Sequence, residues 1–278
     1  MKLRYFWIVV LSVCIGLFFA SCGFQKDDAK SPKIGVALYS FNRFSLDEAV
    51  EKAKLTGVNY IEGFFFHRIG GEFGDRAVSE LNDSEIEKVH SMLNRNQMEM
   101  VSMYADGKTL ADWEALFKKG QQLGMQFLVG EPEPELWDEL NDLAGKYAMK
   151  LAIHEHAKGH SRFWHPDSVL HALDGRDNFK VCADLGHWVR SGLDPVECLQ
   201  KLEGHIVSVH AKDLDTFGNI EAEDVRMGDG VIDYSAVMDE LYRQEYEGFI
   251  FVECEHDWDD NFSDLKDGIL LLHQLKNR

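Results

Sequence analysis

The sequence predicts an α/β fold, and within that class a single-domain (β/α)8 TIM barrel. Short apolar runs rich in Val and Ile alternate with segments that carry helix caps, and the runs are too short for core helices, so we expect buried parallel strands. Eight strand–helix units fit into about 250 residues, the usual size of this barrel. A doubly wound open sheet is the alternative, but no Gly-rich phosphate loop follows the first apolar run, where such a sheet often carries one.

The first half of the chain contains four predicted strands and four predicted helices. We expect the strands at residues 33–39, 58–66, 98–103 and 125–129. Capping boxes at residues 45–48, 84–87 and 109–112 open three helices, because the two polar side chains of such a box satisfy otherwise unpaired backbone amides. These helices are expected to end near Gly57, near Asn94 and at Gly124. The fourth helix follows Pro132 and Pro134 and covers about residues 135–147.

In the second half of the chain, each predicted strand ends at an ionisable residue. The four strand ends are His154, Asp184, His210 and Glu253. A short helix follows Pro166, and Asp194 with Pro195 caps and begins the next one. Asp233 caps a helix that runs to about Gln244, and the last helix runs to the carboxyl terminus. Ionisable groups are costly to bury unless they are paired or bind a metal, so these strand ends predict a functional site.

The amino-terminal residues predict export and a lipid anchor. Residues 1–21 have the form of a lipoprotein signal peptide, with basic residues first, then an apolar run shorter than the roughly 20 residues of a membrane-spanning helix, then small residues. The segment Ala20-Ser21-Cys22 resembles the lipobox of bacterial lipoproteins, which makes Cys22 the lipid anchor, residues 22–32 a tether and residues 33–278 the barrel. We therefore expect an exported, membrane-anchored lipoprotein at the periplasmic or outer-membrane face. An ordinary signal peptide with an incidental cysteine is the alternative.

The composition bears on the size of the core and on nucleic-acid binding, and the cysteine spacing bears on disulfide bonds. Hydrophobic residues make up 45% of the chain, which is enough for a sizeable core, and the net charge is -19. So acidic a surface repels phosphate backbones, and nucleic acid is not an expected partner. Cys182, Cys198 and Cys254 lack the regular spacing of a disulfide framework, so we expect buried free thiols.

The four strand ends have the chemistry of one metal site. A closed barrel brings the carboxyl ends of its strands together, and the two imidazoles and two carboxylates of His154, Asp184, His210 and Glu253 suit one divalent metal ion. Mn2+, Zn2+, Co2+ and Mg2+ all remain candidates, with open coordination positions for a substrate. The alternative for each residue alone is a hydrogen-bonded polar group at a strand end.

The chain resembles the xylose isomerase-like TIM barrel family, often labelled sugar phosphate isomerase/epimerase. The resemblance runs from Lys33 onward and is most specific at residues 151–156, 183–187, 209–213, 228–230 and 251–253. It implies a barrel that binds one divalent metal ion through His154, Asp184, His210 and Glu253. It also implies that Glu62 and Lys212 face the substrate and that His187 lies close to the metal.

One departure from the family pattern affects the expected mechanism. Family epimerases usually have Glu where this chain has His154, and two metal-bound glutamates then work on opposite faces of the substrate. A neutral imidazole bound to metal cannot serve as that second base. The substitution resembles a subgroup of exported family members with His-x-His after the fifth strand. Some relatives are linked with 3-keto-sugars and 3-keto-glycosides, where elimination or hydration replaces epimerisation.

Several side chains are candidates for the chemistry at this pocket. The leading expectation is a metal-dependent sugar isomerase or epimerase that removes a proton next to the carbonyl of a sugar or keto-sugar. Glu253 is the first candidate for the base, with His156, His187 and Glu62 as others. Lys212 would stabilise the developing oxyanion, or alternatively would pair with Asp213.

Two alternative functions remain open at the sequence level. The first is a 3-keto-glycoside lyase or hydratase, and the second is a non-catalytic sugar-binding lipoprotein. An endonuclease of the same superfamily would need more zinc ligands and a basic surface. As further contacts to substrate we expect apolar walls from Trp164, Trp188 and Trp258 and anion contacts from Arg162 and Arg190, against core packing and ion pairing as the respective alternatives.

Overall fold

The computed structural model describes residues 31–276, so the predicted signal peptide, Cys22 and most of the tether lie outside the described residues. Its barrel strands are β1 (Lys33–Ala37), β2 (Tyr60–Phe64), β3 (Glu99–Tyr104), β4 (Phe127–Gly130), β5 (Lys150–His154), β6 (Phe179–Asp184), β7 (Ile206–Ala211) and β10 (Phe249–Val252). They form one closed parallel barrel in the order β1-β10-β7-β6-β5-β4-β3-β2. The predicted TIM barrel is confirmed, and the open sheet is excluded.

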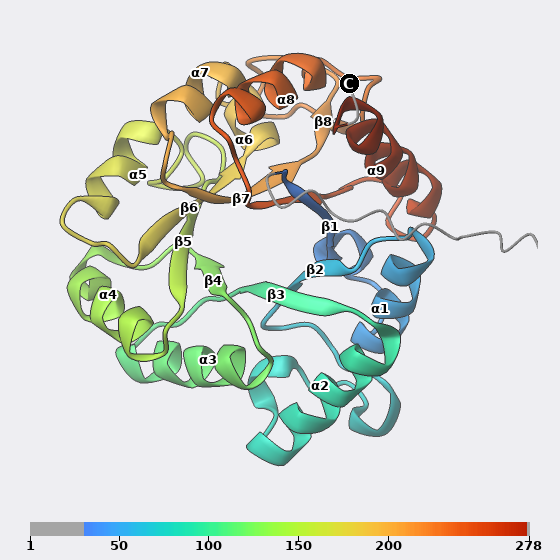
Figure 1. Ribbon diagram of the computed structural model, residues 1–278, viewed down its shortest axis with the longest axis vertical. Helices are drawn as coiled ribbons and strands as arrows, with labels where there is room; N and C mark the ends of the chain where they lie inside the picture. The colour runs from blue at the N-terminus through green and yellow to red at the C-terminus, as the bar shows by residue number, and fades with distance from the viewer. Residues whose placement is uncertain (1–30, 277–278) are drawn as a thin grey trace, which may run out of the picture.

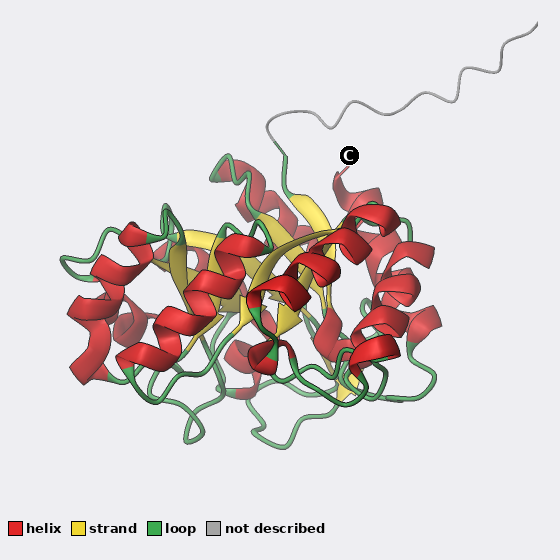
Figure 2. Cartoon of the chain, turned by 90° about the horizontal axis from the view of Figure 1, so that it is seen from below, coloured by secondary structure: helices red, strands yellow, loops and turns green. Residues whose placement is uncertain are grey.

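The helices surround the barrel and follow the strands in the predicted alternation (Figure 1). Their bounds are α1 (Leu46–Leu55), α2 (Asp83–Asn96), α3 (Leu110–Gln122), α4 (Trp137–Lys146), α5 (Pro166–Leu173), α6 (Leu185–Arg190), α7 (Pro195–Lys201), α8 (Tyr234–Arg243) and α9 (Phe262–Lys276). Short 3-10 helices cover Leu38–Phe41, Gly71–Phe73, Val78–Glu80 and Pro134–Leu136. Figure 2 shows the longer loops along the edge opposite to the one where the described chain begins.

The helix caps differ from the prediction at two places. The N-cap of α2 is Asn82 rather than Ser84, because Asn82 Oδ1 accepts the Glu85 N–H at 3.1 Å and also the Ser84 hydroxyl. Helix α6 was not predicted. It begins directly after β6 because Asp184 Oδ1 accepts the backbone N–H of His187 at 2.9 Å. Asp184 is therefore both the last residue of β6 and the N-cap of α6, at the carboxyl end of the barrel strands.

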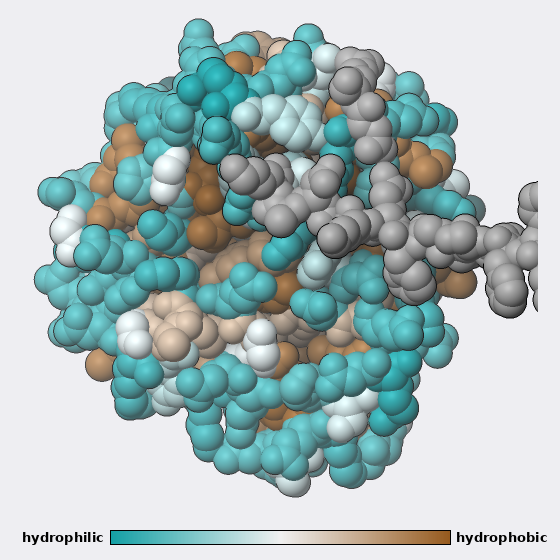
Figure 3. All heavy atoms as spheres, in the orientation of Figure 1, coloured by the Kyte–Doolittle hydropathy of each residue, from teal (hydrophilic) through white to brown (hydrophobic). Residues whose placement is uncertain are grey.

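Two apolar cores support the fold. The larger core lies between strands and helices and contains the fully buried rings of Trp113, Phe117 and Trp188. The smaller core lies inside the barrel and consists of Ala37, Val101, Phe127, Val129, Ala152, Cys182, Phe249 and Phe251. Hydrophilic residues predominate around the periphery of the face drawn in Figure 3.

Cys182, Cys198 and Cys254 are buried and free, as expected. Within residues 31–276, none of the helices combines the length and the apolar character that a crossing of the bilayer requires.

The loop after β7 is fastened by one buried carboxylate. Asp213 accepts the backbone N–H groups of Gly228 at 2.9 Å, Gly230 at 3.1 Å and Ile232 at 3.0 Å. A Cβ atom on Gly230 would lie 2.3 Å from the Asp213 carboxylate, so only glycine fits at this position. Here Asp213 and Leu214 form the short strand β8, which pairs antiparallel with β9 (Asp224–Val225) outside the barrel. Asp213 therefore fixes the loop and does not form the alternative ion pair with Lys212.

We expect the substitution Asp213→Asn to lower the free energy of unfolding by about 3 kcal/mol, because an amide accepts these hydrogen bonds with one neutral oxygen and turns donors toward the others. Urea denaturation followed by circular dichroism measures the change. The control is Asp229→Asn, which changes an exposed acid in the same loop and should alter stability by less than about 0.5 kcal/mol. Equal effects of the two substitutions would contradict the role assigned to Asp213.

Candidate metal centre

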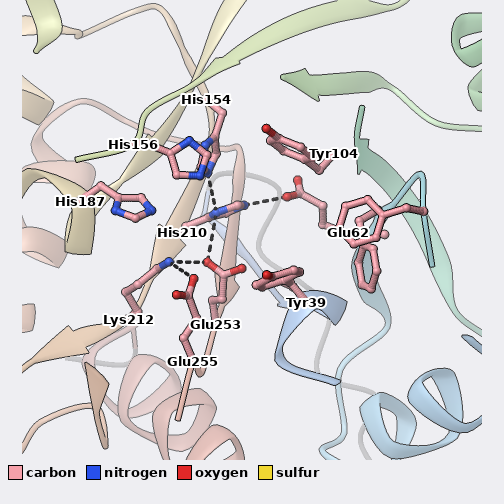
Figure 4. A pocket seen from close by; sticks show the side chains of 14 residues that line it. Tyr39, Glu62, Tyr104, His154, His156, His187, His210, Lys212, Glu253 and Glu255 are labelled. Atoms are coloured by element: carbon pink, nitrogen blue, oxygen red, sulfur yellow. Dashed lines mark hydrogen bonds and ion pairs between the residues drawn. The ribbon is translucent and has the colours of Figure 1, made fainter. Parts of the chain in front are cut away.

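A pocket opens at the carboxyl ends of the barrel strands (Figure 4). It is lined by Ala37, Tyr39, Glu62, Gly63, Phe64, Phe66, Tyr104, His154, His156, His187, His210, Lys212, Glu253 and Glu255. All of the side chains predicted to be catalytic lie in this lining. Of the predicted metal ligands, only Asp184 lies below the surface of the pocket, where it is completely buried.

Strand alternation explains why the four predicted ligands point to one place. Side chains two residues apart on a strand lie on the same face. Each ligand follows, by two residues, a side chain that points into the barrel: Ala152 precedes His154, Cys182 precedes Asp184, Ser208 precedes His210 and Phe251 precedes Glu253. Neighbouring strands place Asp184 beside His210 and His210 beside Phe251. The four donors thus form the layer directly above the apolar interior of the barrel.

The separations between the donor atoms fit a single cation. His210 Nδ1 lies 3.3 Å from His154 Nε2, 3.5 Å from Asp184 Oδ2 and 3.4 Å from Glu253 Oε2. Ligand atoms bound to one ion at about 2.0–2.2 Å are expected to lie roughly 3–3.6 Å from one another in tetrahedral geometry. Asp184 Oδ2 is buried and makes no hydrogen bond among the described residues, although it forms an ion pair with the Lys212 ammonium at 3.2 Å, so a lone pair is left available to an ion. The residues present therefore fit the divalent ion that the sequence predicts.

Lys212 neutralises part of the acidic charge beside these donors. Its side chain is 1% exposed, and its ammonium lies 2.8 Å from Glu253 Oε2, 3.2 Å from Asp184 Oδ2 and 2.5 Å from Glu255 Oε1. Burial alone would lower the pKa of Lys212, but the three carboxylates raise it well above its usual value. Burial would likewise raise the pKa of Glu253, but Lys212 and His210 hold it far below its usual range. Both groups are therefore charged at neutral pH.

A glycine of α6 makes room for the Lys212 side chain. A Cβ atom on Gly186 would lie 2.5 Å from Lys212 Cγ and 2.7 Å from Cδ. In the segment 183–187, Asp184 is thus both a candidate metal ligand and the cap of α6, and Gly186 allows the close contact with Lys212. The helix that the sequence did not predict is what brings this glycine against the lysine.

Glu62 reaches the pocket from β2, on the side opposite to Lys212 (Figure 4). Its Oε1 accepts a hydrogen bond from His210 Nε2 at 2.7 Å, and its Oε2 accepts one from the Ser102 hydroxyl at 2.6 Å. A carboxylate that accepts from the second nitrogen of a metal-binding histidine orients that ring and fixes its tautomer. Both oxygens of Glu62 are therefore used for positioning.

Several residues in or beside the pocket were missed at the sequence level. Glu131 follows β4 and lies outside the pocket lining, and it accepts hydrogen bonds from Nδ1 of the lining residue His156 and from the Ser161 hydroxyl. Tyr39 and Tyr104 line the pocket beside Glu253 and Glu62. Their signal in the sequence was weak, because Tyr39 lies in a 3-10 turn beyond β1 and Tyr104 ends an apolar strand.

Three tryptophans and two arginines do not occupy the positions expected for them. Trp188 is fully buried in the outer core, and Trp164 and Trp258 lie outside the pocket lining. Tyr39, Phe64 and Phe66 supply the aromatic walls instead. Arg162 pairs with Glu133 at the surface, and Arg190 pairs with Asp224, so neither reaches the pocket. In each case the surplus of acidic side chains gives the arginine a nearer partner.

The fold and this cluster define a class, the (β/α)8 barrels with a cluster of candidate metal ligands at the carboxyl ends of the strands. The sequence pattern of the family described as xylose isomerase-like TIM barrel matches residues 50–275. The chain belongs to this family.

Individual relatives are more distant. An inosose dehydratase from Clostridium botulinum is 28% identical over 134 residues, which are 43% of this chain and 45% of that protein. The chain thus spans less than half the length of the curated relatives that it matches. A crystal structure of an uncharacterised Parabacteroides distasonis protein is 29% identical, with a TM-score of 0.70 over 87% of this chain and 98% of that one. The IolI protein with a bound zinc atom shares the fold, at 16% identity and a TM-score of 0.69 over 87% and 96% of the two chains.

Adding Zn2+ or Co2+ to chelator-treated protein is expected to raise the melting temperature, because an ion that binds only the folded state at 100 times its Kd stabilises it by about 2.7 kcal/mol. His210→Ala should abolish most of this gain. Differential scanning calorimetry with and without the ion provides the measurement. His205→Ala, which removes an imidazole outside the pocket lining, is the matched control. A wild-type protein that gains no stability from either ion would contradict the metal site.

Proposed function

We propose that the protein is a divalent-metal-dependent enzyme that removes a proton next to the carbonyl of a sugar or keto-sugar, and that elimination of the group on the next carbon follows. His154, Asp184, His210 and Glu253 would hold the ion. When bound there, the ion supplies Lewis-acid polarisation of the substrate carbonyl. Side chains of the protein would carry out the proton transfers.

The observation that carries this proposal is the arrangement of Glu253 and Glu62. Glu253 is bonded through Oε2 to Lys212, and its other oxygen points to the Tyr39 side of the pocket (Figure 4). It is the only carboxylate of the four donors that lines the described pocket, since Asp184 is buried beneath it. This free oxygen is the group best placed to take the proton. Lys212 would stabilise negative charge that develops on the carbonyl oxygen.

Elimination is favoured over epimerisation because Glu62, the carboxylate on the other side of the described pocket from Glu253, has no free oxygen with which to act as the second base. Epimerisation needs a second base that returns a proton to the opposite face of the same carbon. Both oxygens of Glu62 are occupied by His210 and Ser102, and the position that carries glutamate in family epimerases is His154. Tyr39 and Tyr104 remain as donors toward a leaving group, since burial raises the pKa of each phenol and keeps it protonated.

The comparisons support this class of reaction without fixing the substrate. The curated relatives over the matching segment are named inosose dehydratases, and dehydration is an elimination next to a carbonyl. The IolI protein, which shares the fold, binds a zinc atom, and this supports a divalent metal in the proposed enzyme. Isomerisation or epimerisation of a sugar is the second candidate function, since it begins with the same proton abstraction.

A substrate screen in heavy water distinguishes these outcomes. Metal-loaded protein is mixed with 3-keto-glucosides, with inososes and with free ketoses, and the products are followed by NMR. Loss of the aglycone or of a hydroxyl group is the expected result. Deuterium at a retained stereocentre without elimination would instead identify an isomerase or epimerase. Sugar binding that survives removal of metal, with no exchange of any substrate proton, would identify a non-catalytic binding protein.

We also propose that the enzyme is exported and anchored through a lipid on Cys22. The support is the sequence of the first 22 residues, with its basic start, apolar run and small residues before the cysteine. Full-length protein expressed in a Gram-negative host should fractionate with membranes and incorporate labelled palmitate. The substitution Cys22→Ser should remove the label and release the protein, and labelling that persists would contradict the anchor.

A further inference from the structure

The geometry points to a second cation site beside the first, formed by Glu131, His154 and His156. Ligand atoms of these three side chains all lie within 4.8 Å of one another. His154 belongs to both sites, because its Nε2 faces His210 and Asp184 while its Nδ1 faces Glu131. The site lies at the rim of the pocket, where the rings of His154 and His156 are 4.6 Å apart between centroids. This inference is independent of the reaction proposed above.

The first argument is the state of His154 Nδ1. The side chain is 6% exposed, and this nitrogen is buried without a hydrogen-bond partner among the described residues. Its neighbour Glu131 Oε1 lies 3.8 Å away, which is too long for a hydrogen bond. A carboxylate that merely oriented the ring would accept the N–H at about 2.7–2.9 Å. A cation with bonds of about 2.0–2.2 Å to each atom spans this gap.

The second argument is that the other two donors are already held in place. Glu131 is fixed by the Ser161 hydroxyl and is directed at His156 Nδ1. Glu131 Oε1 and His156 Nδ1 therefore already face each other, as two ligands of one cation would. The His156 side chain is 36% exposed, so water or a substrate oxygen has access to the remaining coordination positions.

The donor set selects the kind of ion. Two imidazoles and one carboxylate form the ligand set of catalytic zinc sites and of non-haem iron(II) sites, and they disfavour Mg2+ and Ca2+, which prefer oxygen donors. His154 would bridge the two ions through its two ring nitrogens, and its ring proton would pass to solvent. The site therefore takes Zn2+, Co2+ or Fe2+, and a pair of ions would lie on opposite sides of one imidazole.

Metal stoichiometry tests the inference directly. Full-length protein is stripped with chelator, dialysed to equilibrium against excess free Co2+, and analysed by mass spectrometry and by the visible spectrum of bound cobalt. We expect two ions per chain in the wild type and one in Glu131→Gln and in His156→Asn. Glu133→Gln, which removes an exposed acid paired with Arg162, is the control and should keep both ions. Thermal melting verifies that each variant is folded.

Two results would overturn the second site. One is a single ion per chain at saturation in the wild type. The other is a wild type with two ions whose number is unchanged in both Glu131→Gln and His156→Asn. If Glu131 only orients His154, its substitution should weaken the single ion by about 10–100-fold and leave a stoichiometry of one. That outcome also rejects the proposal, and it leaves the first site and the proposed reaction intact.

Discussion

Replacing Lys212 by methionine is expected to destabilise the metal-free protein by about 3–5 kcal/mol, the cost of removing one partner from a buried ion pair. Lys212 is 1% exposed and contacts Asp184, Glu253 and Glu255, so its loss leaves three carboxylates close together without a compensating charge. The effect should be much smaller with saturating Zn2+, since the ion would neutralise Asp184 and Glu253 directly. Urea denaturation in chelator and in Zn2+ measures both values.

The control for this prediction is a lysine of the same type in a different environment. Lys201 pairs with Asp167 at the surface, where its side chain is 43% exposed. Exposed pairs contribute about 0–1 kcal/mol, so Lys201→Met should have little effect in either condition. If Lys212→Met cost no more than Lys201→Met, the ammonium would not be what holds the acidic cluster together.

Glu253→Gln is expected to reduce turnover by about 100- to 10,000-fold, the range that general acid–base catalysis contributes. Glutamine keeps the shape of the side chain and one oxygen donor for the ion, but its amide cannot accept the substrate proton. The rate of deuterium exchange at the substrate carbon next to the carbonyl is the measurement, made on protein whose metal content has been matched to the wild type.

Glu247→Gln is the control for Glu253, because Glu247 is an exposed acid just before the same strand. Its exchange rate should equal that of the wild type. Retention of wild-type exchange by metal-loaded Glu253→Gln would show that another group removes the proton. His187 would then be the next candidate, since it lies beside Asp184 and its Nδ1 is buried without a partner among the described residues.

Strand ends could be predicted from the sequence because they depend on local pattern alone. His154, Asp184, His210 and Glu253 each follow a short apolar run, and parallel strands in a barrel end at the same edge. The same alternation separates Lys212 from its neighbour: Lys212 is two residues after His210 and faces the pocket, whereas Asp213 faces the loop that it fastens. Because neighbouring residues of an extended segment point in opposite directions, the sequence already argues against an ion pair between Lys212 and Asp213.

Other features depend on contacts between distant segments and could not be predicted. Glu131 contacts the pocket-lining His156 because β4 lies beside β5, and its partners His156 and Ser161 are 25 and 30 residues away in the chain. Glu62 orients His210 across the barrel, over a separation of 148 residues. The sequence does not distinguish a buried strand carboxylate that contacts a substrate from one that contacts a histidine.

The charges around the pocket have a consequence for the choice of substrate. Among the described residues that line it, Lys212 is the single lysine or arginine, and it is already shared among three carboxylates, while Arg162 and Arg190 are paired elsewhere. A phosphate group adds a charge of about -1.5 to -2 at neutral pH, and it would find no free guanidinium or ammonium here. We therefore expect the proposed enzyme to bind neutral sugars in preference to phosphorylated ones.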